Sequence, residues 1–510
     1  MHIADWTVLA AYFVVMILIG TWARRRVKNS SDYFTAGGKL PWWLAGISHH
    51  MSGYSAAVFV AYAAIAYTNG FALYVWWALT VVVACVVCAF VFAPRWPRMR
   101  IRLHIISPLE YLAIRFNVPT QQLLAWSGTV LKVFDVGAKW TASAVLLNVF
   151  AGVPLVTGIL LTGGVTLIYS TVGGLWADVL TDFGQFIIQL VAGLTMFFVV
   201  MFNLGGVSSL WTVWNQLPPS HSQPFSGQYS LWFFLAYCLI STVSYSGGTW
   251  NLAQRFIASP SGSSAQKASL LSAGLYLVWP FILFFPMWAA PIILPNLTDP
   301  SQSYALLVTH FLPQGLVGLV LAGMFSHTMA MTSSDANAIS AVVVRDIIPV
   351  LTKRRPTKDS KVELTAGRVS TVLFIGLSML IALNSSSFGG VIGLLILWFG
   401  ALVGPIAIPM LLGMLPVFRR SGPTAAIVSW ACGLVVFALT KYVVFGWLAT
   451  FGDATQAITV AAPIVTSIIV FIGIGFVKPW HNEASERLLD TINAPELDGA
   501  AVREDVAVSV

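Results

Sequence analysis

Long apolar runs constrain this chain more than any other feature. A helix that crosses a bilayer needs about 20 predominantly apolar residues, and the sequence contains thirteen runs of this kind. They lie near 5–23, 42–69, 71–94, 121–151, 153–171, 174–204, 229–252, 267–294, 305–344, 366–385, 387–415, 423–446 and 456–477. Only 9% of the residues are charged, which is typical of a polytopic membrane protein. We therefore predict an all-α polytopic membrane protein with thirteen transmembrane helices.

The basic residues predict how these helices are oriented. Cytoplasmic loops of membrane proteins carry an excess of Lys and Arg. If the N-terminus lies outside, every Lys and Arg except Lys132, Lys139 and Lys441 falls in or beside a cytoplasmic loop. The net charge of +8 follows from this topology and requires no nucleic-acid partner. We predict a multi-pass protein of the cytoplasmic membrane with its N-terminus outside and its C-terminus in the cytoplasm.

Two of the apolar runs have polar centres. The first, within 40–69, contains Ser48, His49, His50, Ser52, Gly53 and Ser55, and the second contains Ser244, Ser246, Gly247 and Gly248. Hydrocarbon offers no hydrogen bonds, so polar groups at that depth face protein, an ion or water. Paired interruptions in the two halves of a membrane protein indicate a binding site near the middle of the bilayer. We predict two discontinuous helices that meet there.

Three motifs resemble those of one family of transporters. SSDYFTAGGKLPWW (30–43) resembles the signature that precedes the first core helix of sodium:solute symporters. STVGGLWADVLTDFGQ (170–185) resembles the start of their fifth core helix, and Gln254–Arg255 followed by Ala258 resembles the inner end of their sixth. The order and spacing of the motifs also match, and the resemblance covers roughly residues 1–480.

The resemblance implies a LeuT-type fold, in which two repeats of five helices have inverted topology. The expected parts are a leading transmembrane helix and cytoplasmic loop (1–41), the first repeat (42–204), an external loop (205–228), the second repeat (229–415), two C-terminal transmembrane helices (416–478) and a disordered cytoplasmic tail (479–510).

The same resemblance implies secondary active transport rather than an enzyme. We expect cation-coupled symport of a small organic solute across the membrane by alternating access, with Na⁺ as the coupling ion. No cofactor and no metal beyond that ion are expected. The expected surroundings are the lipid bilayer, and the expected state is a monomer or a weak homo-oligomer. An uncoupled uniporter or a channel of the same fold is the alternative.

The resemblance also predicts where sodium binds. In the family, one sodium site uses backbone carbonyls of the first broken helix, which correspond to Met51 and Tyr54, together with a hydroxyl pair on the eighth core helix. Ala330 and Met331 occupy the positions of that pair in this chain. Some members bind a second sodium nearby, through residues that match Asp182, Ser333 and Ser334. We therefore expect sodium to bind deeper toward the cytoplasm, unless another ion drives transport.

The proton is the alternative coupling ion. His49, His50, His327 and Asp335 are ionisable groups within apolar runs. Histidine titrates near physiological pH, and transporters use such residues as proton relays. Adjacent residues point about 100° apart on a helix, so we expect only one of the paired histidines to face a cavity.

Other charged residues lie within the apolar runs. Lys132, Asp135 and Lys139 are spaced i, i+3 and i+7, which places them on one helical face. They form either a buried structural cluster or a site in which a lysine binds an anionic substrate or pairs with Asp335. For Asp178, one turn before Asp182, we expect a solvated or capping role.

Substrate contacts are expected mainly from the broken helices and the second core helix. The candidates are Ser48, His50, Ser52, Ser55, Val58, Trp76, Trp77, Tyr245 and Trp250. Tyr245 matches an aromatic gate of sugar-transporting members. Val58 and Trp77 replace a glutamine and a glutamate of those members, so an amphipathic or aromatic-tolerant solute is at least as good a fit as a sugar.

Overall fold

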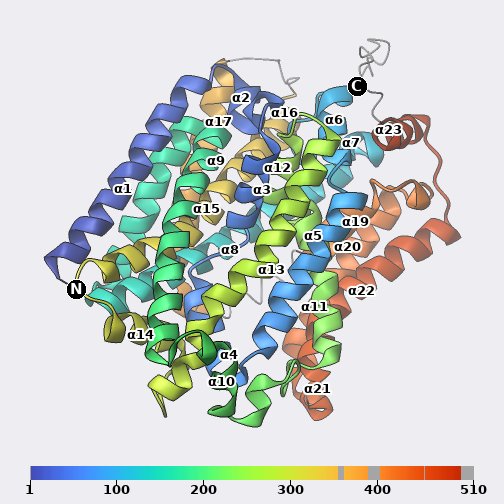
Figure 1. Cartoon of the computed structure of the whole chain (residues 1–510). Helices are drawn as coiled ribbons and strands as arrows, with labels where there is room; N and C mark the ends of the chain where they lie inside the picture. The colour runs from blue at the N-terminus through green and yellow to red at the C-terminus, as the bar shows by residue number, and fades with distance from the viewer. Residues whose placement is uncertain (1, 354–360, 389–402, 453, 496–510) are drawn as a thin grey trace.

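The computed structural model describes residues 2–353, 361–388, 403–452 and 454–495. The regular elements within these ranges are helices (Figure 1). Their bounds are α1 Ile3–Ala23, α2 Ser30–Thr35, α3 Trp42–Met51, α4 Ala63–Asn69, α5 Thr80–Val91, α6 Arg95–Leu103, α7 Leu112–Arg115, α8 Val118–Ala151, α9 Leu155–Asn203, α10 Ser209–Thr212, α11 Leu231–Val243, α12 Asn251–Ile257, α13 Gly262–Ile293, α14 Ser303–Phe311, α15 Leu316–Val342, α16 Ile348–Thr352, α17 Lys361–Leu383, α19 Gly404–Leu412, α20 Pro423–Ala438, α21 Phe445–Leu448, α22 Ala454–Val477 and α23 Glu483–Asn493.

The structure confirms an all-helical membrane protein but does not confirm thirteen spans. Among the described residues, nine helices are long and apolar enough to cross a bilayer, and the bent pair Val118–Ala151 and Leu155–Thr171 adds up to one more. The predicted run 42–69 is divided into shorter helices. Residues 389–402 of the predicted run 387–415 lie outside the described residues.

The helix α15 occupies the centre of the molecule. Nearly all of its residues are buried, and it packs against α9, α1, α17 and α8. Figure 1 shows α2, α6, α16 and α23 at one end of the bundle and α4, α10, α14 and α21 at the other.

A glycine divides α9 where the sequence predicts a boundary between two spans. Gly174 has φ 52° and ψ −145°, so the helix changes direction between residues 171 and 175. A Cβ at this position would lie 2.5 Å from the carbonyl oxygen of Tyr33. Only glycine combines this backbone conformation with so close an approach, which lets α2 pack against α9.

The predicted single run 305–344 is wrong, because it contains two helices. α14 ends at Phe311 and α15 begins at Leu316. Between them, Pro313 lacks the N–H that a helix needs and Gly315 has a φ of +89°. Asp5 of α1 then accepts hydrogen bonds from the backbone nitrogens of Gly315 and Gly318, at 2.7 and 3.1 Å, and caps the start of α15.

The expectation of a disordered tail also needs correction. Residues Glu483–Asn493 form the helix α23, whose side chains Leu488, Leu489 and Ile492 are buried. Arg102 of α6 donates to the carbonyl oxygens of Thr491 and Ala494 at the end of this helix. An apolar stripe on a largely polar segment thus gives the tail a docking face, which overall polarity conceals.

Candidate functional site

The first predicted interruption is present in the structure. α3 ends at Met51, residues 52–56 leave the regular helix, and the chain resumes with a π-helical turn at Val58–Tyr62 before α4. A Cβ on Gly53 would lie 1.9 Å from the hydroxyl of Tyr276 and 2.7 Å from that of Tyr245. Glycine is therefore required for the close packing of this opened segment against α13 and the second broken helix.

The second predicted interruption lies directly opposite. α11 ends at Val243, a π-helical turn covers Ser244–Gly248, and α12 begins at Asn251. Gly247 and Trp250 have φ values of +112° and +62°, which a regular helix does not contain, so the chain is interrupted between α11 and α12. Asn251 Nδ2 donates to the Ser52 carbonyl oxygen over 3.5 Å. The two opened segments therefore meet, as the sequence predicts.

A cavity lies between these segments. Five of the predicted substrate residues line it, namely Ser52, Ser55, Val58, Trp77 and Tyr245. The remaining wall combines hydroxyl, aromatic and charged side chains with the apolar Met331; the polar and aromatic members include Tyr62, Asp135, Lys139, Tyr237, Ser241, Ser244 and Thr249. The wall can therefore hold a solute by stacking and by hydrogen bonding at the same time.

The other four predicted substrate residues have different surroundings. The ring of His50 packs against Tyr54 and Tyr276. Trp76 stacks on Tyr229, and the ring of Trp250 faces Gly128. Ser48 Oγ hydrogen-bonds to Asp182 and to Arg255. Ser48 thus belongs with the charged groups described next.

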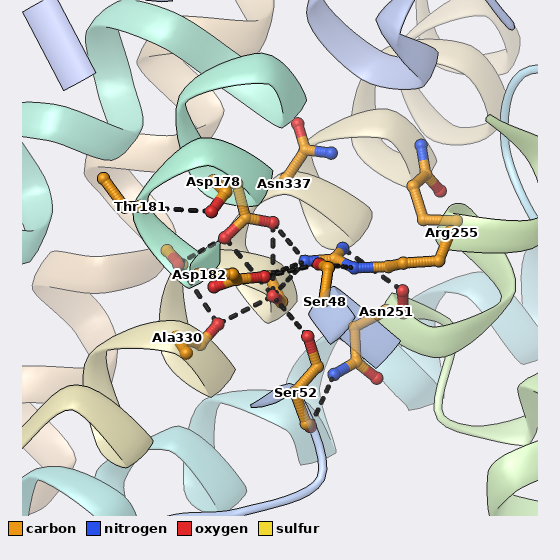
Figure 2. A network of polar contacts seen from close by, with 12 residues as sticks. Ser48, Ser52, Asp178, Thr181, Asp182, Asn251, Arg255, Ala330 and Asn337 are labelled. Carbon is orange, nitrogen blue, oxygen red and sulfur yellow. Dashed lines mark hydrogen bonds and ion pairs between the residues drawn. The ribbon is translucent and has the colours of Figure 1, made fainter. Parts of the chain in front are cut away.

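Arg255 of α12 is buried against two carboxylates of α9 (Figure 2). Its Nη2 donates to Asp178 and lies 3.4 Å from Asp182 Oδ2. The same nitrogen donates to Ser334 of α15, and Nε donates to Ser48 Oγ of α3 over 3.0 Å. Ser333 Oγ donates to the other oxygen of Asp178. We call these six residues the Arg255 cluster: Ser48, Asp178, Asp182, Arg255, Ser333 and Ser334.

The structure brings together part of the predicted sodium site and adds residues to it. Asp182, Ser333 and Ser334 lie in one cluster, as the sequence predicts. The expectation for Asp178 is wrong, because this carboxylate is buried and paired with Arg255. Asp178 precedes Asp182 by one helical turn, so the sequence spacing already places both carboxylates on one face of the helix, where they can share a site.

The charges of the cluster do not cancel. Two carboxylates and one guanidinium leave an excess of one negative formal charge in a fully buried place. Asp182 Oδ1 also has no hydrogen-bond partner in the described part of the chain. Burying an uncompensated charge is costly, so the cluster is suited to a monovalent cation or a proton.

The predicted carbonyl donors lie at the end of α3. Met51 packs with Phe186 and with Ala330, one of the two apolar replacements on α15. The Met51 carbonyl oxygen accepts a weak hydrogen bond from Tyr54 N at 3.4 Å. The Tyr54 ring stacks on Tyr276. Apolar and aromatic side chains thus surround this part of the chain.

The four groups predicted for proton coupling lie in different surroundings. His49 Nδ1 hydrogen-bonds to Ser272 Oγ at 2.8 Å, so this ring is satisfied by a neighbour. The rings of His50 and His327 are both buried, and each packs against the Tyr54 ring. Asp335 pairs with lysines instead of a histidine. A relay between the histidines and Asp335 therefore stays a prediction.

Four charged residues of α8 and α15 form a second buried cluster. Lys132 Nζ lies 2.5 Å from Asp335 Oδ1 and 3.4 Å from Asp135 Oδ2. Lys139 Nζ lies 2.7 Å from Asp135 Oδ2 and 2.8 Å from Asp335 Oδ2. We call Lys132, Asp135, Lys139 and Asp335 the charge quartet. Its formal charges cancel, and the pairing with Asp335 is one of the arrangements that the sequence suggests.

Comparisons with known proteins agree with this architecture. The sodium/sialic acid symporter SiaT of Proteus mirabilis is 25% identical over 86% of this chain and 89% of that protein. The human sodium/iodide cotransporter is 27% identical over 83% of this chain and 68% of that protein. The sodium/glucose cotransporter of Vibrio parahaemolyticus is 25% identical over 74% of each chain.

Solved structures show the same fold. The outward-open structure of a Na⁺-coupled sialic acid symporter superposes with a TM-score of 0.81 at 20% identity, over 93% of this chain and 98% of that one. The closed form of Mhp1, a nucleobase-cation-symport-1 family transporter, gives 0.54 at 16% identity, over 91% and 99%. The sequence model of the sodium:solute symporter family matches residues 33–423 of this chain. Because this match spans most of its length, the chain belongs to the sodium:solute symporter family.

Proposed function

We propose that this transporter holds a sodium ion in the Arg255 cluster and uses it to drive a small organic solute through the central cavity. Family membership makes the chain a multi-pass membrane transporter rather than an enzyme, and supports Na⁺ as the coupling ion. The proposal adds the place where the ion binds and the way in which ion and solute communicate.

The charge of the Arg255 cluster carries the proposal. Sodium is a hard cation that prefers oxygen ligands, as calcium and magnesium do. The cluster supplies carboxylate oxygens from Asp178 and Asp182 and hydroxyl oxygens from Ser333 and Ser334. Sodium would cancel the excess negative charge and give Asp182 Oδ1 a partner.

The position of the cluster explains why an ion there would affect transport. Its side chains come from α3, α9, α12 and α15, and α3 and α12 belong to the two broken helices (Figure 2). An ion that binds between four helices has a different affinity for each of their arrangements. Coupling requires this difference, and the resulting effect on solute affinity is reciprocal.

The predicted topology completes the proposal. Each broken helix would begin one repeat, within 42–204 and 229–415, and the end of the bundle that carries α2, α6, α16 and α23 would face the cytoplasm. Arg95, Arg98, Arg100 and Arg102 at that end agree with the excess of basic residues in cytoplasmic loops. The carboxylates of the Arg255 cluster lie just past the break in α9 at Gly174, which packs against Tyr33 of α2, so the cluster would lie on the cytoplasmic side of the cavity.

Thermal unfolding of the purified protein tests the ion site without a known substrate. NaCl should stabilise the protein more than equal concentrations of KCl or choline chloride, since a ligand stabilises the state that it binds. Asp182→Asn and Ser334→Ala should remove this difference. Ser340→Ala is the matched control, because Ser340 lies on the same helix but donates to Gly367. Sodium stabilisation that survives both cluster variants would contradict the proposed site.

A proton is the second candidate, because protonation of Asp182 would cancel the same excess charge. In that case NaCl, KCl and choline chloride would stabilise the protein equally. Uptake into proteoliposomes would then follow an imposed pH gradient rather than a sodium gradient.

A further inference from the structure

The carboxylate oxygens of the charge quartet differ in the number of hydrogen bonds that they accept. Both oxygens of Asp335 accept from lysine, Oδ1 from Lys132 and Oδ2 from Lys139. Asp135 Oδ2 accepts from both lysines. Asp135 Oδ1, by contrast, is buried and has no hydrogen-bond partner among the described residues. Asp135 lines the central cavity, so a carboxylate oxygen is available at its wall.

A second unsatisfied group lines the same cavity. Ser244 is the first residue of the π-helical turn in the second broken helix, and its hydroxyl is buried without a partner in the described structure. Buried polar atoms in native proteins nearly always have partners, and the exceptions call for an explanation. A bound solute would satisfy Asp135 Oδ1 and the Ser244 hydroxyl together.

The charges around the cavity select against an anion. Lys139 is the lysine of the quartet that lines the cavity, and its ammonium is already held by Asp135 and Asp335. A carboxylate on the solute would approach the free oxygen of Asp135 and be repelled. An organic cation would add a buried charge to a quartet whose formal charges cancel. An uncharged solute with an O–H or N–H donor meets neither cost.

We propose that the transported solute is uncharged and donates a hydrogen bond to Asp135 Oδ1. Its remaining polar group meets the Ser244 hydroxyl, and its ring or apolar face packs against Trp77 and Tyr245. This inference rests on the proposed function, because it names the class of solute that the transporter carries. It makes Asp135 the residue that discriminates neutral solutes from anions.

Matched solutes that differ in charge and in one functional group provide the test. Three series are D-glucose, D-glucosamine and D-glucuronate; D-galactose, D-galactosamine and D-galacturonate; and nicotinamide, 3-(aminomethyl)pyridine and nicotinate. Binding to the full-length protein in NaCl is measured by thermal stabilisation over a range of concentrations. In at least one series the neutral member should bind at least about tenfold more tightly than its charged counterparts, since a misplaced buried charge or an unmade hydrogen bond costs at least that much.

Variants then assign the selectivity to the carboxylate. The double substitution Asp135→Asn with Lys132→Met keeps the quartet electrically neutral and replaces the free oxygen with an amide. It should weaken binding of the neutral solute by about tenfold or more and improve the relative binding of the matching anion. Ser244→Ala should weaken binding several-fold, by about the value of one neutral hydrogen bond. Ser143→Ala is the control, because this buried hydroxyl on α8 also lacks a partner in the described structure but does not line the cavity.

Several outcomes would overturn the inference. They are tighter binding of an anion than of its neutral counterpart, failure of all neutral members to bind, or unchanged selectivity in the Asp135→Asn/Lys132→Met protein that still unfolds cooperatively. If the double variant does not fold, Ser244→Ala against Ser143→Ala decides. Sodium stabilisation that is absent from the wild-type protein, or that survives in both Asp182→Asn and Ser334→Ala, would contradict the proposed ion site alone if the selectivity for neutral solutes is retained.

Discussion

Ser52 Oγ lies 2.9 Å from Ser334 Oγ, so a side-chain hydrogen bond joins the first broken helix to α15. Ser52 also lines the central cavity, whereas Ser334 belongs to the Arg255 cluster. This pair is therefore a direct connection between the proposed solute site and the proposed ion site.

Ser52→Ala should weaken the coupling between sodium and solute more than it lowers the stability of the folded protein. A neutral hydrogen bond contributes about 0.5–1.5 kcal/mol. The ratio of solute affinities with and without sodium should therefore fall by about two- to tenfold. The ratio is measured by titrating a bound solute in NaCl and in choline chloride.

Ser429→Ala is a suitable control for this coupling, because among the described residues the Ser429 hydroxyl donates within α20, to the carbonyl oxygen of Ala426. An unchanged affinity ratio in the Ser52→Ala protein would show that sodium and solute communicate by another route.

Arg255→Gln should destabilise the protein through charge rather than through volume. The substitution leaves Asp178 and Asp182 close together without the guanidinium that lies between them. Breaking a buried ion pair by removing one partner costs about 3–5 kcal/mol. A large fall in the unfolding temperature of the purified protein is the expected result.

A second substitution separates charge from packing in this cluster. Asp178→Asn in the Arg255→Gln background returns the cluster to one excess negative charge, so it should recover part of the lost stability. Non-additivity of the two substitutions measures the interaction between these residues. Simple additivity would mean that the pair contributes no specific electrostatic stabilisation.

Local composition predicts the two breaks better than it predicts their surroundings. Gly53 and the Gly247–Gly248 pair lie among serines within apolar runs, and the structure opens both helices there. The break between α14 and α15 rests on Pro313 and Gly315, which apolar neighbours on both sides conceal. A hydropathy pattern measures membrane compatibility and does not detect such a break.

The charged clusters show where sequence reasoning reaches its limit. Asp178 and Arg255 are 77 residues apart, and Lys132 and Asp335 are 203 apart. Spacing along a helix identifies residues on one face but not their partners on another helix. Resemblance to a family located Asp182, Ser333 and Ser334 together, whereas Arg255 entered the site only through the three-dimensional packing of α12 against α9 and α15.

Gly53→Ala should be poorly tolerated, although alanine favours helices. The added methyl group would collide with the hydroxyls of Tyr276 and Tyr245. Overpacking of this kind costs about 1–3 kcal/mol. Tyr276→Phe removes the nearer hydroxyl, so the double variant should unfold at a higher temperature than Gly53→Ala alone.

Tyr276→Phe by itself controls for the hydrogen bond that Tyr276 donates to the His50 carbonyl oxygen over 2.9 Å. If Gly53→Ala matches the wild type in stability and sodium response, close packing at the break is not required.

Leu489→Ala should loosen α23 from the rest of the protein. Leu489 is 1% exposed within the cluster of buried side chains that joins α23 to α6 and α7. Truncating a buried leucine to alanine costs about 2–5 kcal/mol, which is enough to increase local opening of a short docked helix. Limited proteolysis of the purified protein should therefore cleave within α23 faster in this variant. Arg487→Ala provides the comparison, because Arg487 is exposed and pairs with the exposed Glu483 on the same helix, and such surface pairs contribute little. Equal cleavage of the two variants would show that the buried face of α23 does not hold it in place.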